Sequence, residues 1–267
     1  MTSPAPEFAS DKWFAKGSPE LVVFPKSTEE TAFVLREAYS AGIPVTPRGA
    51  GYGYVGGCTP VAGGIVLCLD RMNRILEINE RDFVAVVEPG VITEKLQLAA
   101  RAKSLFYAPD PASVKDCSLG GNIATNAGGP RCLKYGVTTQ NLLGVRIVSM
   151  DGTIMELGGG HLDAPGLDLL GLICGSEGQL GVVTEATLRI LHKPAGARPV
   201  MIGFDAPEVA GKCVSDIIRA GVLPVAIEYM DRTVIRATED FAGAGYPDVA
   251  ALLIVEVEGT DEEIDTQ

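Results

Sequence analysis

The glycine-rich stretch from Pro47 to Gly57, PRGAGYGYVGG, is the part of the sequence whose residue types and spacing point most directly to chemistry. Glycine is costly to order, so closely spaced glycines indicate a backbone that adopts positive φ or passes close to something bulky. Backbone N–H groups left free in such a loop can converge on an oxyanion without help from cationic side chains. The stretch therefore predicts a phosphate cradle for a nucleotide.

A Rossmann fold is the first alternative, because Gly51 to Gly56 match the dinucleotide pattern G-x-G-x-x-G and Asp70 follows at about 20 residues. In that fold the glycines open a helix. The residues from Gly57 to Gly64, GCTPVAGG, instead contain a proline and further glycines and lead directly into an apolar strand pattern. The sequence therefore disfavours a nicotinamide-binding Rossmann fold, and it also disfavours a purely structural glycine turn.

Two further glycine blocks occur before residue 185. The first, SLGGNIATNAGG from Ser118 to Gly129, has small residues that would let the backbone approach a flat ligand, with amide and hydroxyl groups as donors and acceptors. Its alternative is a helix that uses Gly and Ala for close packing. The second, GSEGQLGVVT from Gly175 to Thr184, could alone be a β-turn and bulge, and Glu177 in it could accept a ribose hydroxyl or cap a turn. Because each block adds an ordering cost, three together favour a ligand site.

Composition and charge exclude several classes of function. Acidic residues outnumber basic ones 34 to 22, giving a net charge of −12, and no stretch concentrates Lys and Arg as a nucleic-acid surface would require. The N-terminus lacks the basic and apolar regions of a signal peptide, and no window approaches the apolar length of a membrane span. We therefore expect a cytoplasmic protein with no nucleic-acid partner and no transmembrane segment. The six cysteines include no C-x-x-C pair and predict buried thiols rather than a metal site.

The elements that must position these blocks follow from apolar periodicity and turn residues. Ser27 and Glu30 form a capping box that begins a helix, and Asp151-Gly152 predicts a hairpin turn. Expected helices span residues 28–40, 93–103, 167–174, 207–220 and 232–241. Expected strands span residues 43–46, 65–69, 75–78, 83–87, 143–150, 154–157, 182–191, 200–204, 225–230 and 251–257.

The pattern changes after residues 192–199, HKPAGARP, which predict a linker. Strands and helices then alternate as at the start of a second α+β domain. Near the end, Thr260 to Glu263 form a second capping box, which is followed by only four residues. We therefore expect the chain to be an N-terminal fragment of a longer protein.

Four motifs in this order resemble one known family. PRGAGYGYVGG is similar to the family's PRGAGTGLSGG, PDPAS from Pro109 to Ser113 is identical to a family segment, GGNIATNAGG is nearly identical to another, and GSEGQLGVVTEATLRI is similar to GSEGTLGVVTEATL. Residues 226–247 resemble the start of the same family's cap domain. The chain thus resembles the flavin-binding half of the vanillyl-alcohol-oxidase/p-cresol-methylhydroxylase (PCMH) superfamily, in the branch of the glycolate oxidase FAD subunit and D-lactate dehydrogenases.

The resemblance implies an α+β fold, with a PCMH-type FAD-binding domain over residues 1–195 and the incomplete start of a ferredoxin-like α+β cap domain over residues 196–267. The FAD-binding domain would consist of two subdomains around a mixed sheet. The first loop would cradle the pyrophosphate, the middle motifs would line the flavin and its ribityl chain, and the last would meet the adenosine end. The implied cofactor-binding residues are Pro47, Arg48, Gly49, Ala50, Gly51, Tyr52, Gly53, Pro109, Asp110, Ser113, Gly120, Gly121, Asn122, Ala124, Thr125, Asn126, Gly128, Gly181, Val182, Val183 and Thr184.

One departure from the family concerns the flavin linkage. Tyr52 stands where the branch usually has Thr and where some superfamily members carry a histidine bound covalently to flavin. A tyrosine cannot form that histidyl bond, so we expect FAD to be bound noncovalently.

The implied activity is oxidation of a D-2-hydroxy acid such as glycolate or D-lactate by hydride transfer to flavin N5, with a base taking the hydroxyl proton. Electrons would pass to a quinone, a cytochrome or an iron–sulfur partner, and a second flavoprotein subunit is a further implied partner. The alternatives are a flavin-binding fragment without turnover and a non-oxidative flavoenzyme of the same superfamily.

No catalytic residue is identified from the sequence. His161 and His192 lie outside the flavin-lining motifs and are expected to be structural or at the surface. Arg131, Lys134 and Tyr135 follow the second glycine block, where they either face substrate or form a solvated turn. In the family, the histidines and carboxylate that bind a divalent metal or act on substrate come mostly from segments that correspond to positions beyond Gln267.

Overall fold

The structure is a computed structural model that describes residues 6–161 and 166–267. The described part of the chain divides into two compact units. The first contains the residues up to Gly128 together with Val137–His192, and the second contains Gly129–Gly136 together with Lys193–Gln267. The division at His192 lies close to the predicted domain boundary after residue 195. The short segment Gly129–Gly136 belongs to the second unit, which the sequence did not indicate.

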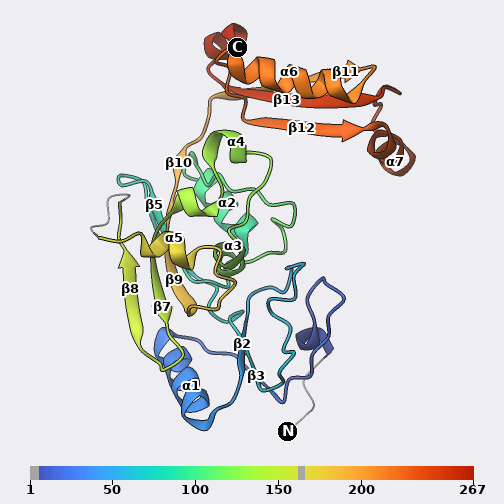
Figure 1. Cartoon of the computed structure of the whole chain (residues 1–267). Coiled ribbons are helices and arrows are strands. Elements are labelled where there is room, and N and C mark those ends of the chain that lie inside the picture. The colour runs from blue at the N-terminus through green and yellow to red at the C-terminus, as the bar shows by residue number, and fades with distance from the viewer. Residues whose placement is uncertain (1–5, 162–165) are drawn as a thin grey trace. The chain divides into compact units, whose positions relative to one another are not determined.

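The first unit begins with a three-stranded parallel sheet in the order β1-β3-β2. Figure 1 labels β2 and β3. Its strands are β1 (Leu21–Val23), β2 (Val45–Arg48) and β3 (Ile65–Cys68). Helix α1 (Thr28–Ala41) connects β1 to β2, as expected from the capping box: Ser27 Oγ accepts the N–H of Glu30, and Gly42 ends the helix with φ of 65°. Leu35 and its apolar neighbours on α1 pack against Leu67 of β3.

Residues 49–64 connect β2 to β3, and all of them are described. They form turns and bends without a helix. β2 and β3 pair in parallel, so the glycine loop lies between two strands and does not open a Rossmann helix. The prediction against a Rossmann fold is confirmed at this point.

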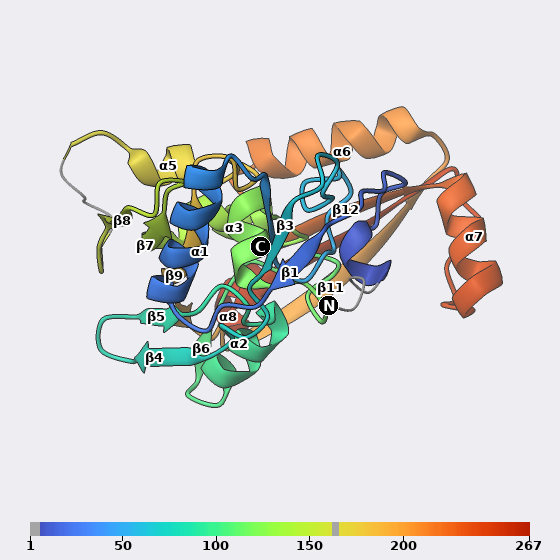
Figure 2. The same ribbon diagram turned by 90° about the horizontal axis from the view of Figure 1, so that it is seen from below.

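A five-stranded antiparallel sheet forms the rest of the first unit's framework, in the order β4-β5-β9-β7-β8. Its strands are β4 (Ile75–Asn79), β5 (Val84–Val87), β7 (Leu142–Val148), β8 (Ile154–Gly158) and β9 (Val182–Arg189). Helix α1 lies beside β7 and β9 (Figure 2). The expected hairpin between β7 and β8 is present, with Gly152 at φ of 82°. The expectation of one mixed sheet is wrong: the described residues form a parallel sheet and a separate antiparallel one.

Helices α2 (Thr93–Arg101), α3 (Leu119–Thr125) and α5 (Leu169–Ile173) contribute to the core of this unit. The short strands β6 (Leu105–Phe106) and β10 (Leu191–His192) pair with each other, and two 3-10 turns, η1 (Pro6–Ala9) and η2 (Thr138–Asn141), complete the unit. The second glycine block is therefore largely a helix. Ser118 caps α3 by accepting the N–H of Gly121, and Asn126 ends it in a left-handed conformation.

The second unit contains a three-stranded antiparallel sheet in the order β11-β13-β12. Its elements are α4 (Cys132–Tyr135), β11 (Gly196–Phe204), α6 (Pro207–Arg219), β12 (Ala226–Asp231), α7 (Arg232–Ala242), β13 (Ala251–Gly259) and α8 (Asp261–Thr266). Helix α6 lies along the sheet and buries Ala210 against Leu253 and Val255 (Figure 1). The capping box at Thr260 is confirmed. The Thr260 hydroxyl accepts the N–H of Glu263, and Thr260 is the N-cap of α8.

The predicted linker at residues 192–199 is wrong for its second half. Residues Gly196–Pro199 form the first part of β11 and pair with the end of β13. Pro199 is accommodated because β11 is an edge strand, where a missing N–H does not break a ladder on the outer side.

Candidate cofactor site

A cavity of about 750 Å³ lies in the first unit, within the range of about 300–1,000 Å³ that is typical of small-molecule and cofactor sites. All three glycine blocks contribute to its wall. The sequence-predicted residues that line it are Pro47, Gly49, Ala50, Gly51, Tyr52, Gly53, Ser113, Gly120, Gly121, Asn122, Ala124, Thr125, Gly181, Val182 and Val183. The structure therefore brings together segments that are far apart in the sequence and that were proposed on separate motifs.

Arg48 packs against Gly51 of the first glycine loop and does not line the cavity. Its side chain is 8% exposed, and Nη1 donates to the carbonyl oxygen of Ser10 at 2.8 Å and contacts Cys58 Sγ at 3.3 Å. Gly51 lies directly over this guanidinium with φ of 75°, so that a β-carbon there would overlap Arg48 Nη2. Position 51 thus requires glycine both for its backbone conformation and for space.

Some backbone N–H groups of the loop are hydrogen-bonded within the protein, and others are available to a ligand. Ala50 N–H donates to Ser118 Oγ at 3.2 Å, and Gly56 N–H donates to Asp11 Oδ2 at 2.8 Å. Within the described part of the chain, the N–H groups of residues 51–53 have no acceptor. The described lining residues include no Lys, Arg or His, so an anion in this loop would depend on backbone donors.

Close packing around α3 explains two further glycines. A β-carbon at Gly49 would overlap Ser118 Oγ, and one at Gly120 would come within 2.7 Å of Pro89 Cβ. Gly121 meets only Ser118 Oγ at 3.3 Å and lines the cavity. Glycine at position 49 thus lets the loop approach the N-cap of α3, and glycine at position 120 lets α3 approach Pro89.

Asn122 and Asn126 use their side chains inside the protein. Asn122 lines the cavity, but its Nδ2 donates to Thr93 Oγ1 at 2.6 Å and the residue is 2% exposed. Asn126 does not line the cavity, and its Oδ1 accepts the N–H of Thr139 at 3.0 Å. The Asn122 amide therefore joins the middle of α3 to Thr93, and the Asn126 amide joins its C-terminal end to Thr139.

Four more of the predicted residues lie away from the cavity wall: Pro109, Asp110, Gly128 and Thr184. The side chain of Gln97 donates to Pro109 O at 3.0 Å and to Asp110 Oδ1 at 3.3 Å. These bonds hold the PDP turn against α2.

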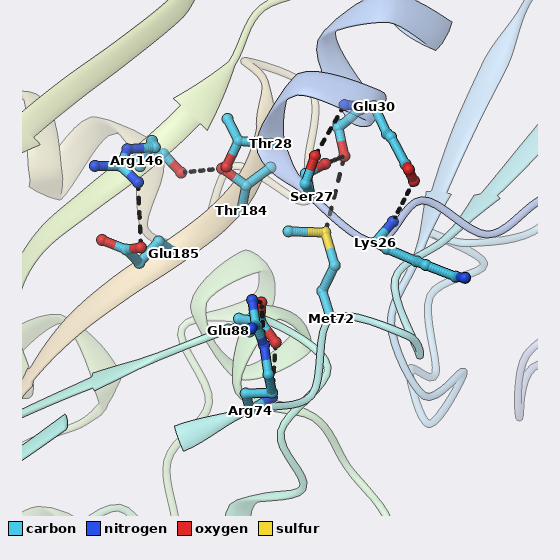
Figure 3. A network of polar contacts seen from close by, with 11 residues as sticks. Lys26, Ser27, Thr28, Glu30, Met72, Arg74, Glu88, Arg146, Thr184 and Glu185 are labelled. Atoms are coloured by element: carbon cyan, nitrogen blue, oxygen red, sulfur yellow. Dashed lines mark hydrogen bonds and ion pairs between the residues drawn. The ribbon is translucent and has the colours of Figure 1, made fainter. Parts of the chain in front are cut away.

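Thr184 belongs to a buried polar network between helix α1 and the antiparallel sheet (Figure 3). Its Oγ1 accepts the hydroxyl proton of Thr28 at 3.0 Å and donates to the carbonyl oxygen of Arg146 at 3.2 Å. Thr184 is 1% exposed, so its hydroxyl is already fully engaged inside the protein. In the same view, Arg146 also pairs with Glu185 at 3.2 Å.

Three acidic residues line the cavity outside the predicted set. The sequence analysis missed Asp11 and Asp116 and left the role of Glu177 undecided. Asp11 comes from the N-terminal segment, and Asp116 follows the PDPAS motif. Desolvation, the charge of Asp116 and a hydrogen bond to it raise the pKa of Tyr52. Glu177 lines the cavity with φ of 55°, and desolvation raises the pKa of its carboxyl group. No local pattern identifies Asp11, whereas the position of Asp116 three residues after a matched motif was a usable signal.

The two histidines lie away from the cavity. His192 in β10 packs edge-on against the ring of Phe83, with 4.6 Å between centroids, and His161 is exposed. Among the described residues, no group of three or more His, Cys, Asp or Glu side chains is placed to hold a metal ion. The described helices also include none that is long and apolar enough to cross a membrane.

The residues Lys134 and Tyr135, considered above as substrate contacts, are engaged within the second unit. Both bind Oε1 of Glu258, Lys134 Nζ at 3.1 Å and the Tyr135 hydroxyl through a short hydrogen bond. Desolvation, followed by the hydrogen bond and the charge of Glu258, raises the pKa of Tyr135. Glu258 is 7% exposed, so this is a buried carboxylate with two donors.

The first unit combines a glycine loop with free N–H groups, the two parallel strands that this loop connects, and helix α3 in the wall of the same cavity. This arrangement defines a nucleotide-cofactor-binding domain, which is joined to an α+β domain. Residues 19–158 match the family described as "FAD binding domain", and residues 193–267 match "FAD linked oxidases, C-terminal domain". The chain therefore belongs to the FAD-linked oxidase family. The fold class and the family resemblance inferred from the sequence are confirmed.

Known relatives give the context of this family. The chain is 46% identical over 247 residues to the glycolate oxidase subunit GlcD of Escherichia coli (strain K12), covering 92% of this chain and 50% of that protein. It is 36% identical over 258 residues to D-lactate dehydrogenase of Anaerostipes hadrus, covering 94% and 54%. A solved structure of alkyldihydroxyacetonephosphate synthase shares the fold, with a TM-score of 0.85 and 23% identity over 97% of this chain and 54% of the other. The chain spans about half the length of the curated relatives it matches.

Proposed function

We propose that this chain binds FAD noncovalently in the cavity of its first unit and forms the flavin-binding part of an oxidoreductase for a D-2-hydroxy acid. The observation that carries the proposal is the cavity itself, which three glycine blocks line and whose described lining residues include no Lys, Arg or His. The similarity to a glycolate oxidase subunit and to a D-lactate dehydrogenase supports glycolate or D-lactate as the kind of substrate.

The residues present fit a dinucleotide cofactor. The free N–H groups of Gly51, Tyr52 and Gly53 would hold the diphosphate, because convergent backbone donors suit an anion in a site without cationic side chains. The backbone of Gly120 and Gly121 would lie against a flat ring or sugar chain, since neither position adds a side chain to the wall.

The remaining wall controls the surroundings of the cofactor. Ile123, Ile173 and Val183 contribute apolar side chains that exclude water from one side of the cavity. Desolvation and the charge of Asp116 raise the pKa of Tyr52, so its phenol stays protonated at neutral pH. When bound, FAD would supply the hydride acceptor, at N5. We assign no catalytic base, because His161 and His192 lie outside the cavity wall.

The electron acceptor and the partners follow from the same reasoning. We propose that electrons pass to a quinone, a cytochrome or an iron–sulfur protein, and that a second flavoprotein or iron–sulfur subunit accompanies this chain in the cytoplasm. The similarity to a protein that is named as a subunit supports an assembly of several chains. Any divalent metal would be held by family segments other than those described here.

The visible spectrum of the purified 267-residue chain tests FAD binding. We expect a yellow protein whose flavin is released by denaturation, which would establish noncovalent binding. A colourless protein that takes up no added FAD would overturn the proposal.

Anaerobic addition of D-lactate, glycolate or D-2-hydroxyglutarate then tests turnover. Bleaching of the flavin absorbance by one of the three would identify the substrate class. A bound flavin that none of them reduces would instead support the alternative of a flavin-binding fragment without turnover, which the lack of His, Lys and Arg among the described lining residues favours.

A further inference from the structure

The N-terminal segment Phe8–Trp13, here called the N-terminal strap, folds over the first glycine loop. It lies outside both matched family regions, which begin at residues 19 and 193. The strap starts in the turn η1 and is closed by a hydrogen bond from Gly17 N–H to Ala9 O at 2.7 Å. Nothing in the glycine motif predicts a partner from this part of the chain.

Three polar contacts fasten the strap to the loop at separate points. Arg48 Nη1 donates to Ser10 O at 2.8 Å at the start of the loop. Lys12 N–H donates to Gly53 O at 3.1 Å in its middle, and Gly56 N–H donates to Asp11 Oδ2 at 2.8 Å near its end. The contacts span the part of the loop whose free N–H groups would hold the diphosphate.

Asp11 is held in place on both sides. Its second oxygen, Oδ1, accepts the N–H of Trp13 at 2.7 Å, so the carboxylate joins the strap's own backbone to Gly56. Hydrogen bonds to an ionised acceptor are stronger than those between neutral groups. Asp11 also lines the cavity, so this bond lies at the cofactor site.

A side-chain contact joins the strap to Tyr52, which lines the cavity. Lys12 Nζ lies 4.4 Å from the centroid of the Tyr52 ring, within cation–π range. Desolvation and the charge of Asp116, which follows the PDPAS motif, raise the pKa of Tyr52. Asp11, Tyr52 and Asp116 all line the cavity, so the strap, the loop and the segment after PDPAS contribute to one site.

We propose that the N-terminal strap is a working part of the cofactor site, in which Asp11 is a positioning residue that keeps the glycine loop closed and slows release of FAD. This inference rests on the proposed function. The carboxylate of Asp11 accepts the Gly56 N–H and, being negatively charged, repels the diphosphate from that position. It therefore confines the diphosphate to the N–H groups of residues 51–53. Retention by the strap takes the place of the covalent linkage that Tyr52 does not provide.

The test measures FAD release from the FAD-loaded 267-residue chain, by the rise of flavin fluorescence after dilution. Asp11→Ala is expected to speed release about tenfold, because it removes a hydrogen bond to a charged acceptor. Asp11→Asn keeps an acceptor oxygen and is expected to restore most of the slow release. Lys12→Met, which leaves every Asp11 contact in place, is expected to speed release by a smaller factor.

Glu7→Ala is the matched control, because Glu7 is exposed in η1 and no hydrogen bond or ion pair among the described residues joins its carboxylate to the loop. It is expected to release FAD as the unchanged protein does. Equal release rates for Asp11→Ala and Glu7→Ala, with FAD bound in both, would overturn the strap proposal and leave the proposed function standing. An unchanged protein that binds no FAD would overturn both. If Asp11→Ala does not fold, a Lys12→Met release rate equal to that of Glu7→Ala decides against the strap.

Discussion

The guanidinium of Arg48 lies directly beneath Gly51, in the space that a side chain at position 51 would occupy. Arg48 was proposed as part of the pyrophosphate cradle, yet in the structure its charge is directed toward Ser10 O and Cys58 Sγ and away from the cavity wall. The loop is therefore shaped by a buried cation that is not itself part of the cavity wall.

Gly51→Ala tests this arrangement. The substitution introduces a β-carbon at a φ of 75° and against Arg48, so we expect the free energy of unfolding to fall by about 1–3 kcal/mol. We also expect FAD affinity to fall at least tenfold, because the loop must move from the position that lines the cavity. Urea unfolding of the chain without FAD and fluorescence titration with FAD measure the two effects separately.

Gly42→Ala provides the control for backbone strain alone. Gly42 has φ of 65° at the end of α1, with no atom within 4 Å of an added β-carbon. We expect a loss of stability of about 1 kcal/mol with unchanged FAD affinity. Equal FAD affinities for the two variants would show that the space above Arg48 does not shape the cofactor loop.

Thr184→Val decides between two roles for a residue predicted to meet the adenosine end of the cofactor. The structure engages its hydroxyl with Thr28 and with the carbonyl oxygen of Arg146. Valine leaves both buried groups without this partner, so we expect unfolding free energy to fall by about 1–3 kcal/mol and FAD affinity to change less than threefold. A tenfold loss of affinity with unchanged stability would instead support the cofactor contact.

Local chemistry explains what the sequence could predict. The hairpin at Asp151-Gly152 and the caps at Ser27 and Thr260 depend on neighbouring residues, and each is present. The first glycine loop was identified because its closely spaced glycines lie between two strand patterns and do not open a helix. All the predicted residues of this loop except Arg48 line the cavity.

Long-range contacts explain what the sequence could not predict. Asp11 reaches Gly56 across 45 positions, and no spacing rule connects a carboxylate to a backbone N–H so far along the chain. Helix α3 was given only as an alternative, because glycine and asparagine have low helix propensity, which the Ser118 cap and packing against the core overcome. Pro199 concealed the start of β11, since proline is tolerated only where the strand is at an edge.

Tyr135→Phe tests whether the segment after the second glycine block is structural. The phenol of Tyr135 donates to the carboxylate of Glu258, which is 7% exposed. Lys134 Nζ also contacts this carboxylate, at 3.1 Å. Removing one donor from a buried carboxylate is expected to lower the stability of the second unit by about 1–3 kcal/mol. Hydrogen exchange along β13 and thermal unfolding measure this loss.

Tyr229→Phe is the matched control, because Tyr229 is 50% exposed on β12. We expect it to leave exchange in β13 unchanged. If Tyr135→Phe is as stable as the unchanged protein but slows flavin bleaching by a hydroxy acid, Tyr135 contacts substrate and is not a structural donor.

Cys68 provides a test of burial through pH. Burial in β3 raises the pKa of this thiol to about 12, from an ordinary value of 9.0. The folded state therefore favours the protonated thiol, and its contribution to stability is complete below pH 9 and is lost as the pH rises toward 12.

At pH 8 we expect Cys68 to resist iodoacetamide in the folded protein and to react after unfolding in urea, because the thiolate is the nucleophile. Mass spectrometry of the labelled peptides measures this, with the half-buried Cys213 expected to react before Cys68. Rapid labelling of Cys68 in the folded protein would mean that β3 opens to solvent, and that the sheet beneath the glycine loop is less stable than its burial indicates.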